Sequence, residues 1–203
     1  MTDTLIRDGW VVDGSGRPPF RGDVAIEDGR IAHVGPVNGT RADRVIEARG
    51  RVVCPGFVDP HSHSDWSILA NPKAESTIRQ GVTTEVVGNC GWTYAPVTEA
   101  SQHFIEGRMR TFAYDGPVEW SSFADHLSWL SRHGHSQNLA WFVGHNTVRY
   151  AAGVFGAQAT ELELRAMEDF VREAMHAGAR TSSPSLRSLP TAAGSRPSGR
   201  DRP

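Results

Sequence analysis

The sequence predicts an α/β protein in which a small antiparallel β-sheet precedes either a parallel sheet or an incomplete (β/α) barrel. Two observations support this fold class. An Asp-Gly pair joins two short runs of alternating polarity near the N-terminus, and strand patterns alternate with helix patterns from about residue 52 onward. We expect three parts, at residues 1–55, 56–179 and 180–203.

The first part, residues 1–55, contains short strand patterns at residues 5–12, 24–27, 31–34 and 45–47. Asp28-Gly29 lies between the second and third of these patterns, and Asp-Gly favours a two-residue hairpin turn. We therefore expect an antiparallel sheet. A sheet this small needs another element to pack against.

The second part, residues 56–179, alternates buried strands with helices. Strands are expected at residues 51–59, 82–87 and 139–143, because these runs are apolar and rich in β-branched residues. Helices are expected from Asn71-Pro72 to Gly81, from Ser121 to Gly134, and from the Thr160/Glu163 capping box to Gly178, and residues 98–114 are also predicted to be helical.

The candidate metal ligands follow two of these strands. His61 and His63 come directly after the first strand, where residues i and i+2 project to the same side, and Cys90 follows the second. Two imidazoles and a thiolate can share one Zn²⁺. Asp59 and Asp65 bracket the histidines and could orient them. The alternatives are solvated loop histidines and a small buried cysteine.

The remaining histidines, tryptophans and Cys54 have less specific interpretations. His145 follows the third strand, and a ligand role and a structural role are equally supported there. Cys54 is expected in the core, whereas Trp66 and Trp92 either pack in the core or line a pocket. Five histidines on predicted helices or at their ends are expected to face solvent: His103, His126, His133, His135 and His176.

Composition excludes several partners and locations. The formal net charge of −2 provides no basic stripe for nucleic acid, and no apolar run reaches the roughly 20 residues of a membrane span. The N-terminus has early acidic residues and no apolar signal-peptide region. Two cysteines in 203 residues fit a reducing cytosol, so we expect a cytoplasmic protein. No protein partner can be inferred.

The third part, residues 180–203, differs from the rest in composition. It contains six Ser, five Arg and four Pro, with Asp201 as its one acidic residue and only two large apolar residues. Burial of so little apolar surface does not offset the entropy of ordering the chain, so we expect a disordered tail.

Four runs carry a family resemblance. They are PGFVDPHSHSD at residues 55–65, NPKAES at residues 71–76, RQGVTTEVVGNCG at residues 79–91 and VGHNTVR at residues 143–149. Together they resemble the D-aminoacylase branch of the amidohydrolase superfamily, over about residues 3–179. The resemblance implies a metal-dependent barrel of the TIM type, preceded by half of a small β-sandwich. It also implies that His61, His63 and Cys90 are zinc ligands for the hydrolysis of N-acyl-D-amino acids.

The chain departs from the family pattern after Ala179. The family's two further histidine ligands, its catalytic aspartate and its groups for the substrate carboxylate lie on later strands, so catalytic and substrate-binding residues stay unassigned. We expect an inactive N-terminal fragment whose tail arises from a frameshift or a sequencing error, with a selected basic tail as the alternative. Two other functions stay open: a cyclic-amide hydrolase, disfavoured by the Asn89-Cys90-Gly91 turn, and a non-catalytic metal-binding remnant.

Overall fold

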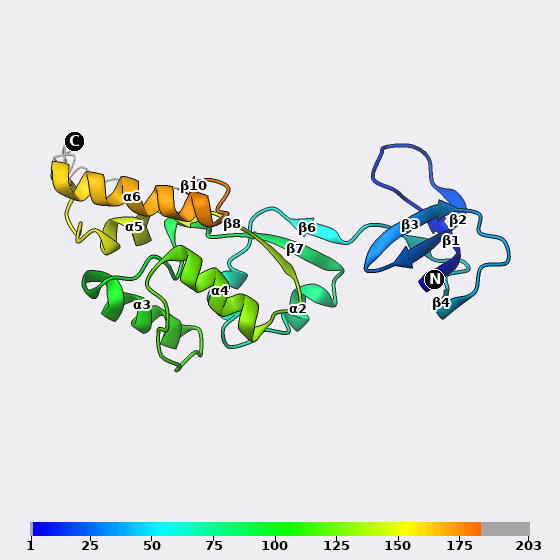
Figure 1. Ribbon diagram of the computed structural model, residues 1–203, viewed down its shortest axis with the longest axis horizontal. Helices are drawn as coiled ribbons and strands as arrows, with labels where there is room; N and C mark the ends of the chain where they lie inside the picture. The colour runs from blue at the N-terminus through cyan, green and yellow to red at the C-terminus, as the bar shows by residue number, and fades with distance from the viewer. Residues whose placement is uncertain (1, 184–203) are drawn as a thin grey trace, which may run out of the picture. The chain divides into compact units, whose positions relative to one another are not determined.

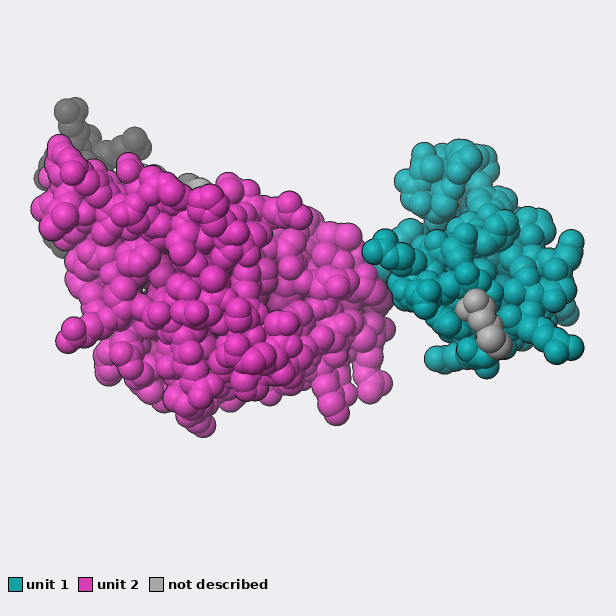
Figure 2. All heavy atoms as spheres, viewed as in Figure 1, with its two compact units in different colours: residues 1–56 teal, residues 57–203 magenta. Residues whose placement is uncertain are grey.

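The computed structural model describes residues 2–183, and these residues divide into two units. The first unit runs to Gly56 and the second begins at Phe57 (Figure 2). No sheet is shared between the two units, and each unit is described separately below.

The first unit is a mixed five-stranded sheet. The strand order is β3-β2-β1-β4, and β5 also pairs with β1. The β1–β2 and β2–β3 pairs are antiparallel, whereas β4 and β5 run parallel to β1. The strands are β1 (Thr2–Val11), β2 (Phe20–Glu27), β3 (Arg30–Gly35), β4 (Ala42–Glu47) and β5 (Val52–Val53).

The prediction of a wholly antiparallel sheet is therefore wrong. Both edges of β2 are occupied by β1 and β3, and β4 adds to the other edge of β1. Residues 36–41 carry the chain back to the start of β1, where Ala42 pairs with Thr2, and β4 then runs in the same direction as β1.

The predicted hairpin at Asp28-Gly29 is confirmed. It joins β2 to β3, and its two residues have φ of 50° and 70°. Positive φ at both central positions is what a type I′ turn requires, and such a turn matches the twist of the strands that it joins.

The second unit contains a parallel three-stranded sheet in the order β6-β7-β8 (Figure 1). Its strands are β6 (Phe57–Asp59), β7 (Val82–Val87) and β8 (Asn138–Trp141), and a second parallel pair joins β9 (Val143–Gly144) to β10 (Ser182–Ser183). Helices separate β6, β7 and β8 along the chain. The predicted α/β class with a parallel sheet is thus confirmed.

The helices of the second unit begin and end at local sequence features. α4 begins after Ser122, one residue later than predicted, and Gly134 ends it. The predicted capping box of Thr160 and Glu163 begins α6, and Gly178 ends it with a φ of 116°. The helices are α1 (Ser64–Ser67), α2 (Glu75–Ile78), the 3₁₀ turn η1 (Asn89–Gly91), α3 (Glu99–Thr111), α4 (Phe123–His133), α5 (His145–Ala151) and α6 (Glu161–Ala177).

The helix expected from Asn71 to Gly81 is mostly absent. The Asn71 carbonyl accepts a hydrogen bond from the Ala74 N–H, which forms a turn, and Ala74 has a left-handed backbone with φ of 44°. A left-handed residue cannot continue into a right-handed helix, so only the single turn α2 follows it.

The apolar run at residues 51–59 forms two strands instead of one buried strand. β5 belongs to the first unit and β6 to the second, with Pro55 and Gly56 between them. Proline lacks the N–H that a continuous ladder would use there. Phe57 and Val58 are 57% and 61% exposed, and Cys54, expected in the core, is also exposed.

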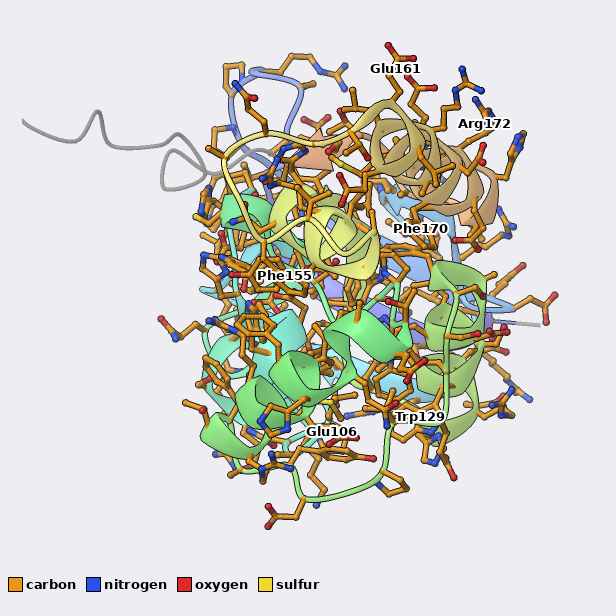
Figure 3. All side chains as sticks on the ribbon, turned by 90° about the vertical axis from the view of Figure 1, so that its left-hand side faces the viewer. Glu106, Trp129, Phe155, Glu161, Phe170 and Arg172 are labelled. Carbon is orange, nitrogen blue, oxygen red and sulfur yellow. The ribbon has the colours of Figure 1, made fainter. Side chains whose placement is uncertain are left out.

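The core of the second unit lies between its sheet and its longer helices. Trp66, Tyr94, Ile105 and Phe123 are completely or almost completely buried in it. In Figure 3, Glu161 and Arg172 of α6 point away from this core, whereas Phe170 lies on the side of α6 that faces it.

His126 is a correction to the expected solvent-facing histidines. It is completely buried, with its ring 4.8 Å from that of Trp120 and 5.4 Å from that of Trp141. It lies on the same face of α4 as Phe123 and Trp129, both of which are buried. A histidine three residues from a core phenylalanine on one helix therefore shares its burial.

Residues 180–183, at the expected start of the disordered tail, are instead hydrogen-bonded to the second unit. The Arg180 N–H donates to the Trp141 carbonyl over 2.8 Å, and Ser182–Ser183 pairs with Val143–Gly144 as β10. The rest of the predicted tail, residues 184–203, lies outside the described residues. Within residues 2–183, no helix has both the length and the apolar character needed to cross a membrane.

Candidate metal centre

His61, His63 and Cys90 meet at the carboxyl ends of two neighbouring parallel strands. His61 and His63 lie just beyond β6, and Cys90 lies in η1, just beyond β7. β6 pairs with β7, so their carboxyl ends are adjacent. All three side chains are exposed, so a ligand can reach them from solvent.

A sharp turn directs Cys90 toward the histidines. Gly88, Cys90 and Gly91 all have positive φ, of 81°, 55° and 79°. A Cβ on Gly88 would lie 2.2 Å from the Phe142 carbonyl oxygen, so only glycine fits at this point. The strained backbone at Cys90 keeps the thiol on the side of the sheet where His61 lies.

The distances between these three residues fit one tetrahedral ion. Their donor atoms all lie within 4.8 Å of one another, and Cys90 Sγ is 3.6 Å from His61 Nε2. Nitrogen at about 2.1 Å and sulfur at about 2.3 Å from one tetrahedral Zn²⁺ are themselves about 3.6 Å apart. The ring centroids of His61 and His63 are 5.6 Å apart in an edge-on arrangement.

His145, the fourth candidate from the sequence, is not part of this group. It begins α5 after β9 and is half-buried. Burial lowers the pKa of its imidazole, and the positive charge of Arg149 lowers it further. The three-residue group contains His61, His63 and Cys90 without it.

Neither of the two aspartates that bracket the histidines is hydrogen-bonded to an imidazole ring: Asp59 accepts from main chain, and the buried carboxylate of Asp65 has no hydrogen-bond partner among the described residues. Asp59 Oδ1 accepts a hydrogen bond from the His61 N–H over 3.0 Å, which fixes the backbone where the loop leaves β6. Asp65 is completely buried, and this burial raises the pKa of its carboxyl to about 8. Nearby backbone amides, including those of Trp66 and Gly88, and the charge of Arg108 oppose that rise.

Arg108, which the sequence analysis did not single out, places a positive charge near the histidines. Its guanidinium lies 4.2 Å from the centre of the Trp66 ring and 5.3 Å from that of Trp92. Burial lowers the pKa of His63, and the charges of His61 and Arg108 lower it further. Trp66 itself is a core residue, whereas Trp92 is only partly buried.

A second group that no sequence pattern indicated, centred on Glu85, is hydrogen-bonded to the loop that carries the histidines. Glu85 on β7 is completely buried and accepts hydrogen bonds from Ser62 and Ser64, the two neighbours of His63 in the chain. Asn89, the residue before Cys90, donates from its amide to the Ser62 carbonyl over 3.1 Å. The two segments that supply the candidate ligands are therefore connected by side chains.

Comparison with known proteins identifies the family. A family model described as the amidohydrolase family matches residues 44–184, which include all three candidate ligands. Two curated relatives from Alcaligenes xylosoxydans xylosoxydans, an N-acyl-D-glutamate deacylase and a D-aminoacylase, are 38% and 36% identical over 178 residues. Each match covers 87% of this chain and 36% of the relative.

A solved structure gives the same result. The N-acyl-D-glutamate deacylase of Bordetella bronchiseptica, complexed with zinc and a phosphonate inhibitor, matches with a TM-score of 0.79 at 33% identity. The match covers 91% of this chain and 38% of that one, so this chain spans little more than a third of the length of its relatives. The resemblance to D-aminoacylases is confirmed, and the chain belongs to the amidohydrolase family.

Proposed function

We propose that this chain supplies a zinc site of a hydrolase that acts on the linear amide of N-acyl-D-amino acids. The observation that carries the proposal is the convergence of His61, His63 and Cys90 within 4.8 Å. The relatives named above are deacylases of N-acyl-D-amino acids or D-aminoacylases, and one of them is complexed with zinc.

The donor set fits zinc by its chemistry as well as by its spacing. Two imidazole nitrogens and a thiolate suit a borderline-soft ion, and an open fourth position leaves room for water or substrate. When bound, zinc supplies Lewis acidity, which makes water acidic enough to act as a nucleophile near neutral pH and polarises the amide carbonyl.

The residues of this chain would bind the zinc ion and orient the loop that carries its ligands. His61 and His63 would each donate a ring nitrogen, and Cys90 would donate its thiolate. Asp59 would fix the start of the ligand loop through the His61 N–H. The described parallel strands, β6 to β10, are fewer than the eight of a complete barrel. We therefore assign no residue in 2–183 to closure of a TIM-type barrel, to recognition of the substrate carboxylate or to proton transfer to the leaving amine.

A zinc titration of the 203-residue chain tests the proposal. We expect a single high-affinity site in the wild type, measured by competition with a chromophoric chelator. His63→Ala and Cys90→Ser should each weaken binding by at least about 10-fold. His103→Ala, which changes an exposed histidine on α3, is the matched control and should bind like the wild type. Equal affinity in all four proteins would contradict the assignment.

A turnover assay separates the metal site from the complete activity. We expect the 203-residue chain with Zn²⁺ to release no D-amino acid from N-acetyl-D-glutamate, because the described parallel strands, β6 to β10, do not enclose a barrel. Turnover that survives purification and disappears in His63→Ala would show that these residues already form a working site.

A further inference from the structure

Glu85 is a buried carboxylate in the middle of the second unit's sheet. It lies on β7, the central strand, and has no accessible surface. Among the described residues it forms no ion pair, and its hydrogen-bond donors are the neutral side chains of Ser62, Ser64 and Gln137. Burial of a carboxylate costs free energy unless its oxygens are hydrogen-bonded, so the arrangement of these donors is constrained.

Two of the donors belong to the loop that carries the candidate ligands. Ser62 Oγ donates to Glu85 Oε1 over 2.9 Å, and Ser64 Oγ donates to the same oxygen over 2.8 Å. Ser62 lies between His61 and His63, and Ser64 follows His63. One carboxylate oxygen therefore holds both residues that flank His63.

The main chain of Ser62 is fixed as well. Its N–H donates to the Val86 carbonyl over 2.9 Å, and its carbonyl accepts from Asn89 Nδ2 over 3.1 Å. With its side chain on Glu85, every polar group of Ser62 has a partner on β7 or on the turn after it. Rotation of the His61-Ser62-His63 segment would break all of these contacts at once.

Gln137 fixes the carboxylate from the other side. Its Nε2 donates to Glu85 Oε2, and its side chain is almost completely buried at the start of β8. The two oxygens of Glu85 thus have different partners: Oε1 accepts from the two serines of the ligand loop, and Oε2 accepts from Gln137, the residue before β8. This division fixes the rotation of the carboxylate and with it the positions of Ser62 and Ser64.

We propose that Glu85 is a positioning residue for the candidate metal centre, acting through Ser62 and Ser64, with Gln137 orienting it. This inference rests on the proposed function, because it assumes that His61 and His63 bind a metal. It predicts that the hydrogen-bond geometry of residue 85, and not only its size or the stability of the fold, determines metal affinity.

Cobalt binding to the full chain provides the test, because Co²⁺ replaces Zn²⁺ and its absorption reports both affinity and ligand geometry. Glu85→Val, which keeps a strand-forming side chain but removes both acceptors, should weaken Co²⁺ binding about 10- to 100-fold and alter the thiolate-to-cobalt absorption. Glu85→Gln should bind nearly as well as the wild type. Its amide oxygen still accepts from both serines, and after a half-turn of the Gln137 amide its own nitrogen can donate to Gln137 Oε1, which has no partner among the described residues.

Two controls separate positioning from stability. Ile105→Val removes one methylene from the buried face of α3, far from Ser62 in the chain, and should lower the thermal stability of the metal-free chain without changing the cobalt spectrum. If Glu85→Val fails to fold, Ser62→Ala replaces it. That variant removes one hydroxyl, which donates to Glu85 and accepts from the Ser64 N–H, and it should also weaken binding.

Three possible results of the cobalt experiment would contradict the proposal, and they can be told apart. Absence of cobalt binding in the wild type would overturn the proposed function and this inference together. Wild-type binding with unchanged affinity and spectrum in folded Glu85→Val or Ser62→Ala would overturn the inference alone. Loss of affinity in Glu85→Gln equal to that in Glu85→Val would show that charge and not hydrogen-bond geometry matters, and would also overturn it.

Discussion

Two neighbouring strands, β6 and β7, reverse the usual relation between polarity and burial. β7 completely buries the carboxylate of Glu85, whereas β6 leaves the apolar side chains of Phe57 and Val58 more than half exposed. Both strands are parallel members of one sheet. The difference follows from position: β7 pairs on both edges, whereas β6 pairs, among the described residues, with β7 alone.

The comparison teaches that side-chain burial in this unit depends on how many elements surround a strand more than on the residue type. Glu85 is tolerated because three neighbouring side chains donate to it. Phe57 and Val58 are not buried, because no described element covers them. Apolar surface contributes about 25 cal/mol for each Å² that it removes from water, so the exposed strand contributes little of this stabilisation.

The largest expected effect contrasts two phenylalanines. Phe123 on α4 is completely buried and packs edge-on against Trp141 with ring centroids 6.0 Å apart. Phe123→Ala should lower the free energy of unfolding by about 3–5 kcal/mol, because it removes a large buried ring and leaves a cavity. Phe57→Ala should change it by less than about 0.5 kcal/mol. Urea unfolding followed by tryptophan fluorescence measures both, and equal losses would contradict the contrast between covered and uncovered side chains.

The next effect is a pH dependence of the free energy of unfolding, which comes from the buried His126. Burial lowers the pKa of His126 from 6.5 to about 3 in the folded chain. Between these values the unfolded chain binds a proton that the folded chain does not, so stability is fully present above pH 6.5 and falls as the pH is lowered. The loss should approach about 1.4 kcal/mol for each pH unit between 6.5 and 3.

The control for this prediction is His126→Phe, which fills a similar volume without a titrating group. Thermal unfolding of the wild type and of this variant, measured from pH 7 to pH 4, should show a steeper loss in the wild type. If stability falls equally with pH in both proteins, water or a hydrogen-bonding group reaches His126 in the folded chain. The core around His126 would then be more polar than its burial indicates.

The smallest effect concerns the contact between two covering helices. Glu173 of α6 accepts hydrogen bonds from the N–H groups of Phe123 and Ala124, over 3.1 and 3.0 Å, at the start of α4. Glu173→Ala should destabilise the chain by about 1–2 kcal/mol, since a partly buried carboxylate at a helix N-terminus satisfies two free donors. Glu161→Ala, at the exposed first turn of α6 (Figure 3), should leave the urea midpoint nearly unchanged. A larger loss from Glu161→Ala than from Glu173→Ala would contradict this assignment.

Elements that depend only on a few neighbouring residues in the chain could be predicted from the sequence. The Asp28-Gly29 hairpin needs only two residues that accept positive φ, and α6 needs only its capping box and amphipathic pattern. The convergence of His61 and Cys90 follows from a general rule, because parallel neighbours end at the same edge of a sheet.

Features that depend on contacts between residues in different elements could not be predicted from the sequence. Glu85 finds its partners 23 and 52 residues away, at Ser62 and Gln137, so no local pattern marks it as buried. The sequence predicts that His126 faces solvent, because the contacts that bury it, with Trp120 and Trp141, come from outside its helix. The parallel arrangement of β4 depends on which edge of the sheet stays free, which is a property of the assembled sheet.

The hydrogen bonds of Asn89 have a consequence for the order in which the chain assembles. Its amide connects Ser62 to Val86, so the three donors of the candidate centre and their link lie within residues 61–90. Only one strand–crossover–strand unit must close to bring them together, and short loops cost less entropy on closure than long ones. Because synthesis proceeds from the N-terminus, all of these residues are synthesised before those of α4, β8 and α6. A metal ion bound at that stage would stabilise the nascent β6–β7 pair ahead of its helical cover.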